Sequence, residues 1–72
     1  MAHHKTTTPL FVKEHIENLY VERTEKGLSR RKVANESGVS IEYIGKYERG
    51  YCYPNPKNYN QLARVLNWEE WG

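Results

Sequence analysis

The feature that most constrains this fold is the stretch Gly38-Val39-Ser40, which separates two helical patterns of about two turns each. Ser29 and Ser40 stand where N-caps are expected, and Gly38 stands where the first of the two helices must end. Helices this short are not stable alone in water. They must therefore pack against each other and against longer helices, at an angle that Gly38 allows by adopting a positive φ and that Val39 fills.

A longer helical pattern precedes this unit and predicts a single helix over residues 9–26. Thr8 is a good N-cap, Pro9 is favoured at the first helical position, and Gly27 is a natural stop. The face expected to be buried repeats at i, i+4, i+7 and i+11, and consists of Val12, Ile16, Leu19 and Arg23.

Another helical pattern follows the unit, after a loop with two prolines at residues 51–56. Asn55 is its N-cap and Pro56 its first residue. The buried face predicted for this helix consists of Tyr59, Leu62, Ala63 and Leu66. Trp68 and Trp71 fall in a last turn, the candidate for a fifth helix. No strand-period run is found, so the sequence predicts an all-α bundle of four to five helices.

Seventy-two residues allow one domain, which we assign to residues 9–72, after a disordered polar tail at residues 1–8. Cys52 is the only cysteine, so no internal disulfide can form, which fits a cytoplasmic setting. His3 and His4, with only His15 elsewhere, are too few ligands to predict a metal site. No apolar run approaches the ~20 residues of a membrane span, and no cofactor or membrane partner is expected.

The charge of the chain is concentrated in its middle. The net charge is +2, but residues 26–57 carry seven positive and three negative side chains, whereas the rest carries four positive and six negative ones. The positive side chains of the middle are Lys26, Arg30, Arg31, Lys32, Lys46, Arg49 and Lys57. A basic patch around one structural unit is typical of nucleic-acid binding, although a solvated basic surface would produce the same pattern.

The segment GLSRRKVANESGVSIEYIGKYERG, residues 27–50, resembles the helix-turn-helix of the phage repressor and Cro family, also called the xenobiotic-response-element (XRE) family. The similar positions are Gly27-Leu28-Ser29, Val33-Ala34, Gly38-Val39-Ser40, Ile44, Tyr47, Glu48 and Gly50. The stretch LARVLNW, residues 62–68, resembles the family's fourth helix. This resemblance implies a compact bundle of the lambda-repressor type with its helix-turn-helix at about residues 29–49.

The resemblance also implies roles for particular residues. Arg23 and Glu48 occupy positions where the family has a partly buried, structural ion pair. The helix that begins at Ser40 is expected to enter the major groove of DNA. Its base-reading residues would be Ser40, Ile41, Glu42 and Lys46.

Three of these side chains suit a particular DNA group. Ile41 would contact a thymine methyl, Glu42 would accept from a cytosine amino group, and Lys46 would donate to guanine. Ile41 has a structural alternative, which is to fold back against the junction of the two short helices. Gly45, in the same helix, is consistent with a close approach of DNA and equally with neutral drift.

Phosphate contacts are expected mainly at the start of the helix capped by Ser29. Arg30 and Arg31 oppose the helix dipole there, which suggests a role in binding an anion. The further candidates for phosphate contacts are Lys32, Tyr43, Arg49 and Lys57.

Together these features predict a sequence-specific regulator of transcription, such as a phage or mobile-element repressor, that binds double-stranded DNA as a homodimer. Dimer contacts are expected from Tyr51, Tyr53, Trp68 or Trp71, with Trp68 favoured instead as a core residue. The alternative function is an antitoxin-like or docking module, since one fold serves several functions. No nucleophile with a base, phosphate loop or metal cluster predicts an enzyme.

Overall fold

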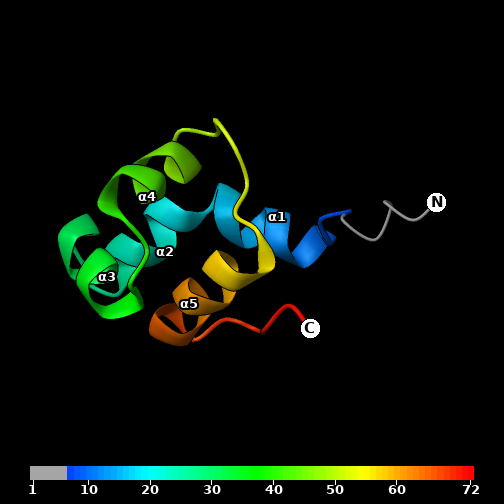
Figure 1. Cartoon of the computed structure of the whole chain (residues 1–72). Helices are drawn as coiled ribbons and strands as arrows, with labels where there is room; N and C mark the ends of the chain where they lie inside the picture. The colour runs from blue at the N-terminus through cyan, green and yellow to red at the C-terminus, as the bar shows by residue number, and fades with distance from the viewer. Residues whose placement is uncertain (1–6) are drawn as a thin grey trace.

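Five α-helices form the regular structure of residues 7–72, the part of the chain that this computed structural model describes (Figure 1). They are α1 (Leu10–Glu17), α2 (Leu19–Glu25), α3 (Arg30–Ser37), α4 (Ile41–Glu48) and α5 (Pro56–Leu66). No strand occurs within this part, so the predicted all-α class is confirmed. Of the predicted tail, only Thr7 and Thr8 are described, and His3 and His4 lie outside the described residues.

The single helix predicted over residues 9–26 is wrong, because Asn18 interrupts it. Asn18 has a φ of −105° and a ψ of 14°, and its Nδ2 donates to the carbonyl of Glu14 at 3.0 Å. Asparagine is a poor helix former whose side chain competes for backbone hydrogen bonds. The buried face nevertheless continues through the break, since Val12, Leu19 and Arg23 are all buried.

The first helix also begins one residue later than the sequence predicts. Pro9, with a ψ of 155°, is still extended and is the N-cap of α1. Its carbonyl accepts from the backbone N–H groups of Val12 and Lys13, each at 3.1 Å. Thr8 therefore lies before the cap rather than at it, and the first turn of α1 has no side-chain cap.

The turn between α3 and α4 follows the prediction. Ser29 Oγ accepts from the backbone N–H of Lys32 at 3.0 Å, and Ser40 Oγ accepts from that of Tyr43 at 3.1 Å. Gly38 ends α3 with a φ of 83°. Val39 is 3% exposed. Each of the two short helices thus begins at a serine cap, which contributes about 1 kcal/mol, and Gly38 and Val39 form the turn between them.

Helix α5 begins as predicted, because Asn55 Oδ1 accepts from the backbone N–H of Asn58 at 2.8 Å and Pro56 follows the cap. It ends at Asn67, which has a φ of 64°. No helical turn follows at Trp68 and Trp71, so the candidate fifth helix of the sequence is wrong. The left-handed residue turns the chain, and Trp68 instead enters the core, where it is 8% exposed.

The helices enclose one core, and the buried faces predicted for the first and last helical patterns contribute to it. The buried apolar side chains are Val12, Ile16, Leu19, Val33, Val39, Ile44, Tyr47, Tyr59, Leu62, Ala63, Leu66 and Trp68. The loop after α4 then crosses to α5 on the outside of the bundle (Figure 1). Truncation of a core leucine such as Leu62 to alanine is expected to cost about 2–5 kcal/mol. Because Ile44 and Tyr47 are among these core residues, the inner side of α4 is packed against the core.

Candidate DNA-binding interface

The outer side of α4 is a stripe of residues at i, i+1, i+4, i+5 and i+8, namely Ile41, Glu42, Gly45, Lys46 and Arg49. On the opposite side of the same helix, Ile44 is fully buried and Tyr47 is 3% exposed. Ile41, at 39%, and the three charged residues of the stripe are exposed, whereas Gly45 is buried. One eight-residue helix is therefore anchored by one face and open to solvent on the other.

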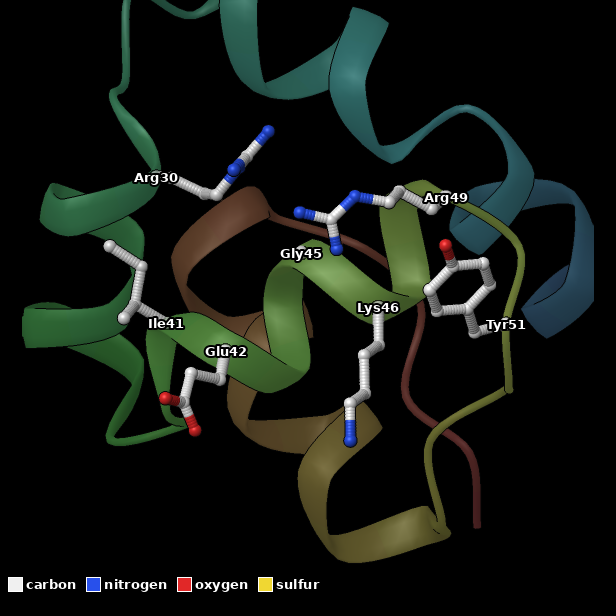
Figure 2. Close-up of a pocket in the computed structure, with 7 residues that line it drawn as sticks. All are labelled: Arg30, Ile41, Glu42, Gly45, Lys46, Arg49 and Tyr51. Atoms are coloured by element: carbon white, nitrogen blue, oxygen red, sulfur yellow. The ribbon is translucent and has the colours of Figure 1, made fainter.

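The stripe lines an open hollow of about 390 Å³, together with Arg30 from the start of α3 and Tyr51 from the following loop (Figure 2). Glu42 and Lys46 project from one side of α4, whereas Arg30 and Arg49 lie on the other side (Figure 2). The hollow thus combines three cationic side chains with one carboxylate. An exposed, mainly cationic helix face is suited to a polyanion whose edge also offers hydrogen-bonding groups.

A buried ionic cluster lies beneath this face. Arg23 Nε donates to Glu48 Oε2 at 2.7 Å and Arg23 Nη2 to Glu48 Oε1 at 3.3 Å, with side chains only 7% and 4% exposed. Arg23 Nη1 also donates to the carbonyl of Leu28 at 2.8 Å. This cluster joins α2, α4 and the residues before α3. Loss of one partner would leave a buried charge unpaired, at a cost of about 3–5 kcal/mol.

Arg30 links the cluster to the outer face. Its Nε donates to Glu48 Oε1 at 3.2 Å, while its side chain remains 41% exposed. From the sequence, Arg30 was predicted only as a phosphate contact, so this bond to Glu48 was not predicted. One guanidinium edge is held by Glu48, and the rest of the group stays available on the surface.

The remaining candidate residues lie around the hollow rather than in it. Arg31, Lys32 and Lys57 are exposed, and Lys32 pairs with Glu36 at 3.1 Å within α3. Tyr43 is 49% exposed and has Lys46 Nζ at 5.2 Å from its ring centroid. Ser40 is exposed and caps α4. The hollow therefore brings together Arg30, Ile41, Glu42, Lys46 and Arg49, but not the other candidates.

Two features of the site were missed from the sequence. A Cβ atom added to Gly45 would lie 3.4 Å from Arg49 Nη1 and 3.8 Å from Arg30 Nη1, so both guanidinium groups cover this glycine. Tyr51, predicted only as a dimer contact, has its ring 5.8 Å from Arg49 Cζ. The i, i+4 spacing of Gly45 and Arg49 was the available signal for the first feature.

Comparison with known protein families agrees with this geometry. A family model described as Helix-turn-helix matches residues 19–70, from the start of α2 to beyond α5. Because this is well over half of the chain, the protein belongs to that family, the XRE or Cro/C1-type helix-turn-helix proteins. It is therefore a DNA-binding domain of the transcription-regulator type. The family is one of regulatory DNA-binding domains and not a family of enzymes.

Two further comparisons, with curated proteins and with solved structures, give no match. No helix within residues 7–72 is long and apolar enough to cross a membrane.

Proposed function

We propose that the protein is a sequence-specific repressor of the phage or mobile-element type that inserts α4 into the major groove of double-stranded DNA. The observation that carries this proposal is the division of α4 into a buried side with Ile44 and Tyr47 and an exposed, polar outer side. A polar outer side is common in surface helices, but here three cationic side chains, Arg30, Lys46 and Arg49, also gather around an open hollow on that side. The major groove of B-DNA admits such a helix and presents a distinct pattern of donors and acceptors at each base pair.

Base recognition would be carried out by Ser40, Ile41, Glu42 and Lys46. Ile41 offers an apolar surface to a thymine methyl, and Glu42 accepts from a cytosine amino group. Lys46 donates to N7 or O6 of guanine. Ser40 keeps its hydroxyl hydrogen for a base or phosphate, since its oxygen acts as the acceptor in the cap.

Phosphate contacts would come from the start of α3 and from the edges of the hollow. Arg30 and Arg31 stand in the first turn of α3, which contains no acidic residue. Their charges reinforce the N-terminal backbone N–H groups as an anion site. Lys32, Tyr43, Arg49 and Lys57 are further candidates for phosphate contacts. Phosphate contacts set the register of the protein on DNA, and base contacts specify the sequence.

A homodimer would bind two half-sites about one helical turn, ~34 Å, apart. The aromatic residues still available for a dimer contact are Tyr51, at 71% exposed, and Tyr53, at 43% exposed. Trp71 is partly buried and hydrogen-bonded through its backbone to the side chain of Asn60. Tyr53 is therefore the preferred candidate, because Tyr51 also lines the hollow on α4 that is proposed to face DNA.

The experiment that tests the proposal is selection of bound sequences from a random duplex pool, followed by gel-shift titration of the enriched site. We expect one enriched site with two related halves, and an affinity at least about 10³-fold above that for random DNA at the same salt concentration. Failure to bind any duplex even at low salt would favour the antitoxin-like or docking function instead. Weak binding without enrichment would leave DNA binding but remove sequence specificity.

A further inference from the structure

Gly45 lies at the centre of the outer stripe of α4, between Ile41 one turn before it and Arg49 one turn after it. Glycine in a helix interior costs about 1 kcal/mol relative to alanine. Gly45 has an ordinary helical backbone, so no positive φ requires it. It is nevertheless buried, although it lies on the exposed side of the helix. Something other than the core therefore covers this position.

The covering group is chiefly the guanidinium of Arg49. A Cβ atom at position 45 would lie 3.4 Å from Arg49 Nη1 and 3.6 Å from Arg49 Nη2. Both terminal nitrogens of Arg49 thus lie in the space that a longer side chain at position 45 would occupy. Figure 2 shows the Arg49 side chain folded back along α4 toward Gly45 rather than extending away from the helix.

Arg49 is held there without an acidic partner. No carboxylate within residues 7–72 forms an ion pair with it, whereas Arg30, on the other side of Gly45, is bound to Glu48. The Tyr51 ring, 5.8 Å from Arg49 Cζ, supports the guanidinium by a cation–π contact. The guanidinium groups of Arg30 and Arg49 lie beside one glycine and repel each other. Because Arg49 forms no ion pair in the described part of the chain, its donors are suited to an acceptor supplied from outside the chain.

We propose that Arg49 acts as the side chain that position 45 lacks, and that it reads a guanine at the centre of the site. This inference rests on the proposed function, because it assumes that the outer stripe faces base edges. A guanidinium fork donates two hydrogen bonds to O6 and N7 of guanine, which no other base pair edge accepts in the same way. Gly45 is then a specificity determinant, because its missing side chain admits the arginine.

The test compares variants in the random-duplex selection and in gel-shift titrations of the enriched site. Arg49→Ala is expected to lose about tenfold to hundredfold of the preference for guanine at one base pair. Gly45→Leu, which keeps Arg49 but fills its place, should lose the same preference at the same base pair. The matched control is Gly45→Ala, whose added Cβ makes only ordinary contact at 3.4 Å and should keep the preference.

The double variant Gly45→Leu with Arg49→Ala should lose no more guanine preference than either single variant, because both substitutions remove the same contact between Arg49 and guanine. Thermal melts of all variants ensure that the comparison is made on folded protein. The opposing result is that Arg49→Ala weakens binding to every sequence equally and lowers the salt dependence by about one unit. That result would make Arg49 a phosphate contact and overturn the inference, while leaving the proposed function in place. If the wild-type protein enriches no DNA site, both the inference about Arg49 and the proposed function are wrong.

Discussion

The two sides of α4 differ in how completely their polar groups are satisfied. On the inner side, Glu48 accepts hydrogen bonds from Arg23 and Arg30, and the hydroxyl of Tyr47 accepts from Asn58 Nδ2 at 3.2 Å. On the outer side, Glu42 and Arg49 form no ion pair within the described part of the chain. The difference teaches that a single short helix can separate the residues that stabilise the fold from those left available to a ligand.

The strongest way to break this comparison is to remove Arg23. We expect Arg23→Ala to lower the free energy of unfolding by about 3–5 kcal/mol. It removes the buried partner of the Glu48 carboxylate, which keeps only the 3.2 Å bond from the partly exposed Arg30. Urea unfolding followed by circular dichroism measures the loss. The matched control is Arg31→Ala, an exposed arginine of α3, which should change stability by less than about 0.5 kcal/mol. Equal effects of the two variants would show that the ion pair is not a structural element.

Alkaline pH should weaken the core through Tyr59 of α5. Burial, aided by the charges of Glu69 and Glu22, raises the pKa of Tyr59 to about 12 from 10.0. Because the folded state holds the proton more tightly, this stability is fully present below pH 10 and is lost as pH rises from about 10 to 12. The loss for a two-unit shift is about 3 kcal/mol.

The measurement for Tyr59 is urea unfolding at a series of pH values. Other groups also titrate in this range, so the quantity of interest is the difference between wild type and Tyr59→Phe. This variant loses the hydrogen bond from the hydroxyl to the carbonyl of Glu69 at every pH, which gives a constant offset. The free energy of unfolding of wild type minus that of Tyr59→Phe should fall between pH 10 and 12. A value that stays constant over this range would contradict the raised pKa of Tyr59.

On the outer side, we expect Lys46→Ala to relax the preference at one base pair by about 1–3 kcal/mol and to leave the melting temperature nearly unchanged. The physical reason is that Lys46 is exposed, its Nζ lies over the ring of Tyr43, and it forms no ion pair within residues 7–72. Binding to a library of single-base variants of the enriched site measures the effect. A large drop in melting temperature with an unaltered base preference would reverse the assignment of the two sides.

Arg30 sharpens the comparison, because it belongs to both sides. Its bond to Glu48 is partly exposed, so Arg30→Ala should cost less than about 1 kcal/mol of stability. If Arg30 contacts a phosphate, the same variant weakens binding to all sequences alike and lowers the salt dependence by about one unit. Salt titrations of the specific and a random duplex measure both. A loss confined to one base pair would make Arg30 a base contact.

Much of the fold was predictable because local chemistry determined it. Serine and asparagine caps at Ser29, Ser40 and Asn55, and the glycine at Gly38, marked helix ends that tertiary packing did not change. The break at Asn18 was not predicted, since an apolar face at constant spacing conceals a local interruption of the backbone. The end of the chain was also misjudged. Trp68 and Trp71 fit a helical spacing, but burial of Trp68 in the core is more favourable than a further helical turn.

The candidate site was predictable residue by residue but not as an arrangement. Exposure of Ile41, Glu42 and Lys46 followed from the buried positions of Ile44 and Tyr47, because helical geometry fixes which residues share a face. Two contacts could not be predicted from helical geometry. The bond of Arg30 to Glu48 and the position of Arg49 over Gly45 depend on side-chain rotamers and on how α3 packs against α4.

The surroundings of Trp68 have a practical consequence. Its indole stacks between His15, with ring centroids 4.6 Å apart, and Tyr59, with centroids 5.6 Å apart, and its N–H donates to Glu22. Neither of the two tryptophans lines the hollow on α4, whose aromatic residue is Tyr51. Intrinsic tryptophan fluorescence of this protein therefore reports on the junction of α1, α2 and α5, so emission spectra can follow unfolding separately from events on the outer side of α4.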